Sequence, residues 1–295
     1  MNIEVGTAPD NWGVWFPSDE KQIPWDRYLD EASEAGYEWT ELGPYGYLPT
    51  DPQILGPELE RRKLRLGAAF VFGNMTSTEQ FALLEEETDR AGALTSALGA
   101  KFHLLIDVPY TDLFTGEQLR PPRLEGDGWK YFIETNHKLA RLLQDRYNLT
   151  AVHHPHAETH VEYEDQIERF LEDTDPNLIS LCLDTGHHAY RGGDPVSFMR
   201  KHHKRIPYLH IKSVDRELQT RVEKEGIPFA KAVAMDLFVE LTQGVVNFDS
   251  FVNVLKEINY EGCAIVEQDM YPCPFEKPGP IARRNRKYLR KVGIG

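Results

Sequence analysis

Short apolar runs alternate along the chain with longer amphipathic stretches. Eight of the runs are typical of buried strands: 3–8, 37–42, 65–72, 101–108, 149–155, 178–184, 206–212 and 262–267. Between them, apolar residues recur every three or four positions, which is the period of a helix with one buried face. Trp129, Phe132, Ile133 and Leu139 form one such face. Strands that alternate with helices in this way predict a parallel sheet covered by helices.

Eight strand–helix units predict an α/β fold, a single (β/α)8 TIM barrel spanning residues 1–295, and not an open doubly wound sheet. No Gly-x-Gly-x-x-Gly opens a predicted helix, which disfavours a dinucleotide-binding fold. Two predicted loops exceed the usual length: 109–126 after strand four and 213–247 after strand seven. Both leave the C-terminal ends of strands, where barrel enzymes have their active sites, so we expect lids or subunit contacts. A passive surface insertion is the alternative.

Two capping-box patterns predict where helices begin. Thr76 stands three residues before Glu79, and Thr159 stands three residues before Glu162. In this pattern the first side chain accepts from a backbone N–H of the first turn, and the acidic side chain reaches back. We therefore expect helices to start directly after Thr76 and Thr159.

The charge balance narrows the function classes. The 295 residues hold 33 Lys and Arg against 47 Asp and Glu, a net charge of −14, which disfavours a nucleic-acid partner. Six basic residues within 283–291 are interpreted as a solvated helix face. No apolar run approaches the ~20 residues that span a bilayer, and the start does not resemble a secretory leader. The sequence predicts a cytoplasmic protein with no membrane partner, and its three cysteines predict no disulfide framework.

Polar residues stand at the C-terminal ends of the predicted strands, which converge on one pocket in a barrel. They are Glu41, His153, His154, His156, Asp184, His187, His210, Lys212, Glu267 and Asp269. A lone buried histidine is more often a core residue than a ligand, but charged groups are rarely buried unless they are paired or bound to metal. Imidazoles and carboxylates from four successive strands suit a divalent cation, Mn²⁺ first and Co²⁺, Fe²⁺ or Zn²⁺ as alternatives.

Several segments carry a resemblance to a known family. The segment 183–187 (LDTGH), with 210–212 (HIK) and 266–268 (VEQ), resembles the xylose-isomerase-like barrel superfamily of sugar isomerases and epimerases. Three further segments are similar to its inosose dehydratase branch: 6–13 (GTAPDNWG), 41–47 (ELGPYGY) and 154–162 (HPHAETHVE). The resemblance covers essentially the whole chain, and the motifs of strands six and seven are fairly specific.

The resemblance implies a metal held at the ends of strands five to eight. On this chain the ligands fall on His154, Asp184, His210 and Glu267, with a neighbouring histidine as the alternative to His154. Many sugar epimerases of the superfamily have Glu where His154 stands, and they pass a proton between two opposed glutamates. The departure at position 154 therefore favours an elimination reaction, in which only one carbon acid is deprotonated.

A cation on a ketone oxygen and an adjacent hydroxyl would stabilise the enediolate formed when a base removes the α proton. A hydroxyl or alkoxyl β to the carbonyl is then expelled with help from a general acid. We expect a metal-dependent lyase that acts on a keto-cyclitol, such as 2-keto-myo-inositol, or on a 3-keto-glycoside. His156 and Lys212 are the candidate base and acid, in either order, and His187 would order a hydroxyl. Glu41 is a fourth candidate, and salt bridges and loop caps are the structural alternatives for Lys212 and Glu41.

The loop after strand one is unusually aromatic for a position over a pocket. Asn11, Trp12 and Trp15 are the candidate substrate-binding residues, because flat apolar faces suit the C–H face of a sugar or cyclitol ring. The same aromatic residues could instead plug the barrel or pack against a second copy of the chain in a homo-oligomer.

Three other functions stay open at this point. A keto-sugar isomerase or epimerase with the same metal is the first rival. A metal-dependent phosphodiesterase of the endonuclease type would need a positive groove, against which the charge argues. A sugar-binding barrel without activity would not need the full set of ligands.

Overall fold

A computed structural model describes residues 1–295 of the protein. Eight parallel strands close into a barrel in the order β1-β10-β7-β6-β5-β4-β3-β2. They are β1 (Asn2–Thr7), β2 (Trp39–Glu41), β3 (Arg65–Gly73), β4 (Phe102–Asp107), β5 (Thr150–His153), β6 (Ile179–Asp184), β7 (Tyr208–Ile211) and β10 (Glu261–Val266). Each coincides with one of the eight predicted runs. The predicted (β/α)8 barrel is confirmed.

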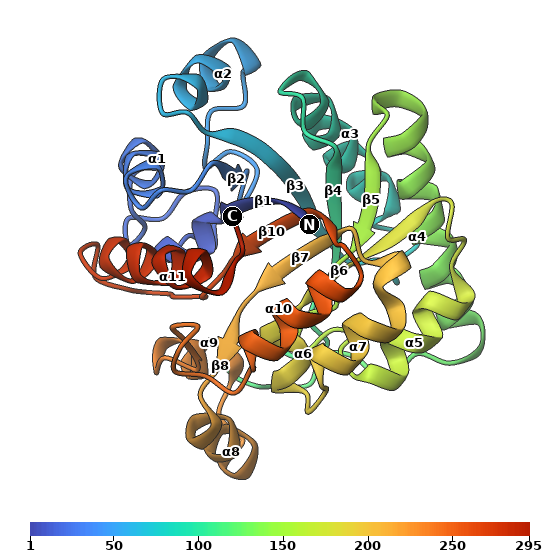
Figure 1. The fold of residues 1–295 in the computed structure, drawn as a ribbon. Helices are drawn as coiled ribbons and strands as arrows, with labels where there is room; N and C mark the ends of the chain where they lie inside the picture. The colour runs from blue at the N-terminus through green and yellow to red at the C-terminus, as the bar shows by residue number, and fades with distance from the viewer.

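Helices surround the strands on the outside of the barrel (Figure 1). They are α1 (Trp25–Glu34), α2 (Pro52–Glu60), α3 (Phe81–Ala97), α4 (Gly126–Tyr147), α5 (Glu164–Asp173), α6 (Thr185–Tyr190), α7 (Pro195–His202), α10 (Phe248–Glu257) and α11 (Pro278–Val292), with the 3₁₀ turns η1 (Pro9–Trp12) and η2 (His203–Arg205). The two termini lie close together beside β1 and β10 (Figure 1). The N-terminal ammonium donates a hydrogen bond to Asn259 at 2.6 Å. No helix is both long and apolar enough to cross a bilayer.

Two apolar cores lie on the two faces of the strands, as the alternation of side chains in a β-strand requires. The larger one, with 59 buried residues, fills the space between strands and helices. The smaller one fills the barrel itself: Ala8, Ala68, Leu104, Ile106, Val152, Cys182, Tyr208, Cys263 and Ile265. The barrel is therefore packed at its centre, and polar chemistry is confined to the strand ends above this plug.

The two long segments differ in their internal structure. The segment after β7 holds a two-stranded antiparallel pair, β8 (Ser213–Val214) with β9 (Phe238–Val239), and two helices, α8 (Arg216–Glu225) and α9 (Phe229–Ala234). Helix α8 projects from the rest of the molecule (Figure 1). The segment after β4 has a single bridge, Thr111 with Gln118. The two segments touch, because Ala230 N–H on α9 donates to the Leu113 carbonyl at 2.9 Å.

Both capping-box predictions are wrong, because their side chains have other partners. Thr76 bonds through its backbone and its hydroxyl to Asn74 Oδ1, and α3 begins five residues later, at Phe81. Glu162 is 2 % exposed and binds Arg191 and the Tyr110 hydroxyl, so α5 begins at Glu164. A buried ion pair outweighs a local cap here, since an unpaired buried carboxylate would cost more than an open helix end.

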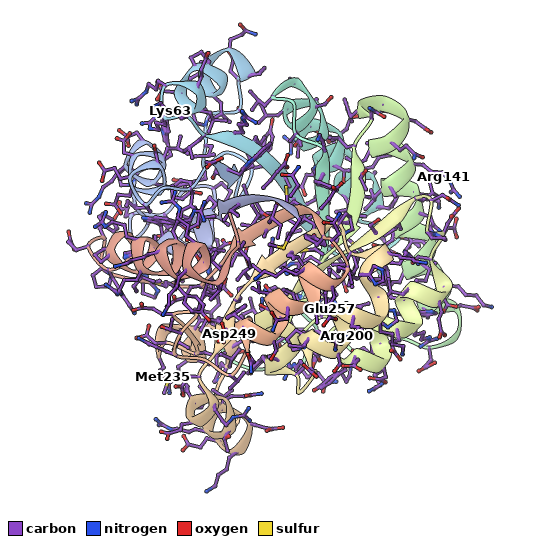
Figure 2. The ribbon with its side chains drawn as sticks, in the orientation of Figure 1. Lys63, Arg141, Arg200, Met235, Asp249 and Glu257 are labelled. Carbon is purple, nitrogen blue, oxygen red and sulfur yellow. The ribbon has the colours of Figure 1, made fainter.

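Ion pairs at the surface join segments that are distant in the sequence, and they lie outside the cluster of polar residues at the strand ends. Arg200 on α7 and Glu257 on α10 lie next to each other (Figure 2), with 3.2 Å between Arg200 Nη2 and Glu257 Oε2. On the basic helix α11, Arg284 pairs with Glu240 at 2.8 Å. Arg286 is buried and donates to the backbone carbonyls of Gly36 and Ile294. These two basic side chains of α11 thus bind parts of their own chain.

Candidate functional site

The side chains of His153, the last residue of β5, and His154, the next residue, point to opposite sides of the strand. His153 points outward, where its Nδ1 lies 2.9 Å from Asn136 Oδ1 and its ring lies against Phe170. His154 is on the opposite side and is 3 % exposed, with its Nε2 3.5 Å from Asp184 Oδ2. Of the neighbours that could replace His154 as a ligand, His153 is therefore turned away from the cluster.

Asp184 ends β6 and serves two purposes at once. Its Oδ1 caps α6 by accepting from the backbone N–H groups of Gly186 and His187, at 2.7 and 2.8 Å. Its Oδ2 faces His154 and His210, at 3.5 and 3.7 Å, and the ammonium of Lys212, at 3.0 Å. Capping fixes the carboxylate plane, because both N–H groups hold the same oxygen. The second oxygen is aimed at the imidazoles as a result.

His210 and Glu267, the remaining two predicted ligands, are in direct contact. His210 Nδ1 lies 3.0 Å from Glu267 Oε2, and its Nε2 lies 2.8 Å from Glu41 Oε1. Burial alone would lower the pKa of His210, but neighbouring Cys182, Glu267 and Glu41 raise it well above the usual value. Glu41 also accepts from the Tyr208 hydroxyl at 2.8 Å. Glu41 thus contacts His210 on the side opposite Glu267, which suits a residue that orients His210, and its catalytic role stays a prediction.

Successive pairs among the four predicted ligands stand at distances that suit a divalent cation. Both ring nitrogens of His154 are buried and lack a hydrogen-bond partner. Such atoms are costly to bury unless something binds them. The contacts along the series His154–Asp184–His210–Glu267 are 3.5, 3.7 and 3.0 Å. Ligands about 2.1 Å from a metal stand about 3.0–3.4 Å apart, so these separations are close to those of a metal site.

Other residues could supply a ligand to the same cation. Cys182 has its sulfur within 4.8 Å of ligand atoms of both His154 and His210. Burial raises the pKa of the Cys182 thiol to about 11, which favours the protonated, poorly ligating form. His187 makes a comparable group with His154 and Asp184. The donors are nitrogen and carboxylate oxygen with one protonated thiol, a set that suits Mn²⁺, Fe²⁺, Co²⁺ or Zn²⁺.

Lys212 lies at the centre of the acidic residues and is 1 % exposed. Its Nζ is 3.0 Å from Asp184, 2.8 Å from Glu267 and 3.1 Å from Asp269. Burial alone would lower the pKa of Lys212, but the three carboxylates raise it well above the usual value. A lysine that acts as a base needs a lowered pKa, and the pKa of Lys212 is shifted in the opposite direction. The salt-bridge alternative is present, and a charged Lys212 has protons to give and no lone pair with which to accept one.

Gly186 makes room for Lys212. A Cβ at position 186 would lie 2.7 Å from Lys212 Cβ, closer than real side-chain contacts allow. Thr185 contributes as well, since its hydroxyl accepts from Lys212 N–H at 2.9 Å. The Asp-Thr-Gly-His segment therefore combines a carboxylate, a backbone anchor and a gap for the lysine stem in consecutive residues.

His156 and His187 form a pair of rings beside the ammonium. Their centroids are 3.9 Å apart, and His187 Nε2 lies 3.2 Å from Lys212 Nζ. His156 Nδ1 contacts the Ala157 carbonyl at 2.8 Å, which leaves Nε2 as its free nitrogen. Burial, His154 and Lys212 lower the pKa of His156 to about 3, and burial also lowers the pKa of His187 well below its usual value. Both rings are therefore neutral.

Asp269 is a member of the cluster to which the sequence argument gave no role. Its two carboxylate oxygens each lie 3.1 Å from Lys212 Nζ, and burial raises its pKa to about 6. Asp10, Glu267 and Asp269 also bring carboxylate oxygens within 4.8 Å of one another. The alternation of side chains is the signal that could have found Asp269, because it lies two residues beyond Glu267.

The structure does not support the substrate contacts predicted for Asn11 and Trp12. Asn11 donates to Thr7 Oγ1 at 2.6 Å and to the Val266 carbonyl at 2.8 Å, and it accepts from Gln268 N–H. Trp12 is 1 % exposed and donates to Glu31 Oε2 at 2.8 Å. Both side chains fasten η1 to its surroundings, and Asn11 Nδ2 and Trp12 Nε1 have no hydrogen left to donate to a substrate hydroxyl.

Trp15 is placed differently from Asn11 and Trp12. It is half-buried and stacks on Tyr271, with centroids 5.1 Å apart and planes inclined by 19°. It also borders an apolar cluster that includes Phe229 and Phe238. Trp15 therefore keeps the position that a substrate-binding aromatic residue would need.

The segment after β7 covers the histidines and the lysine. Phe229 on α9 has its centroid 5.6 Å from that of His156 and 6.1 Å from that of His187. Phe238 on β9 lies 5.2 Å from the His187 ring, and Lys212 Nζ is 4.9 Å from the Phe238 centroid. The apolar residues of this segment thus pack directly on the candidate catalytic groups, as a lid does.

A family model described as a xylose isomerase-like TIM barrel matches residues 29–292. The chain belongs to this family. Among its curated relatives is an inosose dehydratase from Clostridium beijerinckii, 28% identical over 98% of this chain and 97% of that protein. The resemblance inferred from the sequence motifs is thereby confirmed.

Two solved structures illustrate the shared fold. One is a probable 3-DHS dehydratase, AsbF, from Bacillus anthracis, with a TM-score of 0.73, 16% identity and coverage of 98% of this chain and 99% of that one. Another is the IolI protein with a zinc atom, with a TM-score of 0.70, 16% identity and 98% coverage of each chain. At this level of identity the likeness establishes the fold of the barrel and nothing finer.

Proposed function

We propose that this protein is a divalent-metal-dependent carbon–oxygen lyase that acts on a keto-cyclitol or a 3-keto-sugar. One observation carries the proposal: the contacts from buried ligand atoms of His154 and His210 to Asp184 Oδ2 are 3.5 and 3.7 Å, beside a charged lysine and two neutral histidines. The name of the Clostridium beijerinckii relative, inosose dehydratase, supports a dehydratase chemistry for this chain. The metal ligands proposed are His154, Asp184, His210 and Glu267.

A cation held there would act as a Lewis acid on the substrate carbonyl and make the neighbouring C–H bond more acidic. His156 is the proposed base, because its imidazole is neutral and its Nε2 is free to accept the α proton. Lys212 is the proposed acid, because three carboxylates keep its ammonium charged, and it gives a proton to the oxygen that leaves. His187 lies between the two and orders a substrate hydroxyl.

The cover over the site suits this chemistry. An enediolate exposed to water could be reprotonated before the leaving group departs. Phe229 and Phe238 exclude water from the side of α9 and β9, and Leu113 fixes α9 to the segment after β4. We propose that the two long segments form the lid together and move apart to admit substrate.

The test is to load the protein with Mn²⁺, Co²⁺, Fe²⁺ or Zn²⁺ and incubate it with 2-keto-myo-inositol and with a methyl 3-keto-glucoside. A lyase produces an enone absorbance and releases water or methanol, and the activity disappears with a chelator and returns with metal. The epimerase alternative predicts a new stereoisomer without enone or water. No change in either substrate with any of the four metals would contradict the proposal.

A further inference from the structure

Three loops bring aromatic rings together at one side of the barrel mouth. Trp15 follows β1, Phe114 follows β4 and Tyr271 follows β10. Trp15 stacks on Tyr271 on one side and meets Phe114 on another, with centroids 6.5 Å apart and planes inclined by 60°. Phe114 is 56 % exposed, so its ring is open to solvent beside Trp15. We call Trp15 and Phe114 the aromatic corner, with Tyr271 behind it.

The aromatic corner is connected to the catalytic groups by direct packing. Leu113, next to Phe114, accepts from Ala230 N–H, and the adjacent Phe229 packs on His156. Trp15 borders the same apolar cluster. The corner is therefore attached to the rim of the proposed lyase site.

Exposure within the site shows on which side it opens. Lys212 and His210 are 1 % exposed and Asp184 is 2 % exposed, whereas His156 and Asp10 are half-buried. Asp10 belongs to the β1 loop that also carries Trp15. A substrate seated on the buried groups therefore has its outer end beside the β1 loop and its aromatic corner.

From this placement we propose that the aromatic corner binds an aromatic or apolar ring in the leaving group of a 3-keto-glycoside. A free keto-cyclitol bears oxygen on every ring carbon and would leave these apolar faces uncovered once it reached the polar groups below. A glycoside can place its keto-sugar on the polar groups and its aglycone ring against Trp15 and Phe114. Two inclined aromatic faces suit a flat ring, which stacks on one and meets the edge of the other.

The reaction this implies is redox-neutral and rests on the proposed function. The C2–H and C1–O bonds of the 3-keto-glycoside break, and a C1=C2 double bond forms. The C2 proton goes to His156, the electron pair of the C1–O bond leaves with the aglycone oxygen, and Lys212 supplies that oxygen's proton. The products are an enone and a free alcohol or phenol, and no oxidant or reductant is consumed.

The kinetic test compares phenyl and methyl 3-keto-β-glucosides in the metal-loaded protein and in Phe114→Ala. We expect the substitution to raise KM for the phenyl glycoside about three- to tenfold and to leave KM for the methyl glycoside unchanged. Phe114→Tyr keeps the ring and should restore the wild-type ratio. Leu119→Ala is the matched control, because Leu119 lies in the same segment and is 54 % exposed. Equal changes for both substrates, or none, would overturn the aromatic corner as an aglycone site.

A binding test separates this inference from the lyase proposal. Phenyl and methyl β-glucosides without the keto group cannot eliminate, so their binding is measured by titration of the metal-loaded protein with tryptophan fluorescence and calorimetry. We expect tighter binding of the phenyl glucoside, with the preference lost in Phe114→Ala and in Trp15→Leu and kept in Leu119→Ala. Preference without turnover of any keto-sugar would contradict the lyase and keep the aromatic corner. Turnover without preference would do the reverse.

Discussion

Strand β5 carries histidines on both of its faces, and the two faces differ in what they offer those side chains. Outward, His153 finds one amide oxygen and the ring of Phe170. Inward, His154 finds the carboxylate of Asp184 and the ring of His210. Burial lowers the pKa of both, to about 3 for His153. Burial and residue type are thus the same, and only the partners separate a core histidine from a candidate ligand.

The same contrast holds around the barrel. His103 on β4 faces the helices, is fully buried and has no partner on either ring nitrogen. Inward-facing His210 has a carboxylate on each side. The outward histidines contribute to packing and carry no charge, while the inward ones are surrounded by acidic groups. A count of histidines therefore says little about function until each one is assigned to a face.

The largest effect is expected when each of the two neighbouring histidines, His153 and His154, is replaced by alanine. His154→Ala should abolish metal binding and bring turnover below detection, because a ligand atom is lost. His153→Ala should keep one metal per chain and only lower the melting temperature, because it leaves a cavity against Phe170. Metal content by mass spectrometry of the purified proteins decides the matter. Equal metal loss in both variants would show that the side of the strand on which a histidine lies does not decide whether it binds the metal.

Lys212→Met should lower turnover by about 10²–10⁴, the usual contribution of a general acid or base, with metal retained. The methionine keeps the length of the stem but has no proton to give. Lys204→Met, on an exposed lysine before β7, is the control and should leave kcat unchanged. Near-normal turnover in Lys212→Met would remove the ammonium from the mechanism and leave it a structural ion pair.

Glu41→Gln should weaken metal affinity by about 10–100-fold, the effect typical of residues that orient a metal-binding histidine. The amide no longer offers a charged acceptor to His210 Nε2. Calorimetric titration with Mn²⁺ measures the change directly. Tyr208→Phe removes the other hydrogen bond to Glu41 but keeps the Glu41–His210 contact, so its effect should be smaller. If the two variants are equally weak, Glu41 does not act through His210.

The smallest expected effect is the contribution of the outward-facing His103 to the pH dependence of the unfolding free energy. Burial lowers the pKa of His103 to about 3, below the unfolded value of about 6.5. The unfolded chain therefore takes up the proton first, so stability is full above pH 6.5 and is lost as pH falls toward 3. For this group the loss is about 2 kcal/mol between pH 7.5 and pH 5. His103→Leu should flatten the pH dependence of the unfolding free energy by that amount, measured by urea denaturation; parallel curves would contradict the assignment.

Several features of the site follow from the chain's local pattern. The eight apolar runs coincide with the eight barrel strands, since only segments of that composition can be buried on both faces. A step of two residues places His154 with His156, and Glu267 with Asp269, on one side of the chain. The Asp-Thr-Gly-His segment places a carboxylate at the end of β6, where one oxygen caps α6 and the other faces the imidazoles. These inferences depend on neighbours within about five residues.

Other features depend on residues that are far apart in the sequence. Glu41 contacts His210 across the inside of the barrel, although the two residues are 169 positions apart in the sequence. Asn11 is held by backbone atoms at 266 and 268, so both hydrogens of its amide are already donated within the protein. Local periodicity carries no information about such partners, because it depends on which strands close the barrel beside one another.

The sequence by itself determined the barrel, the faces of its strands and the residue types at their ends, because apolar periodicity and side-chain alternation act over a few residues. Only the tertiary structure decided that Lys212 is charged, because its pKa depends on carboxylates from β6 and from the end of β10. It also decided that α9 packs on His156 and that Phe114 stays exposed beside Trp15. Electrostatic and packing free energies depend on distances in space, and the closure of the barrel sets those distances.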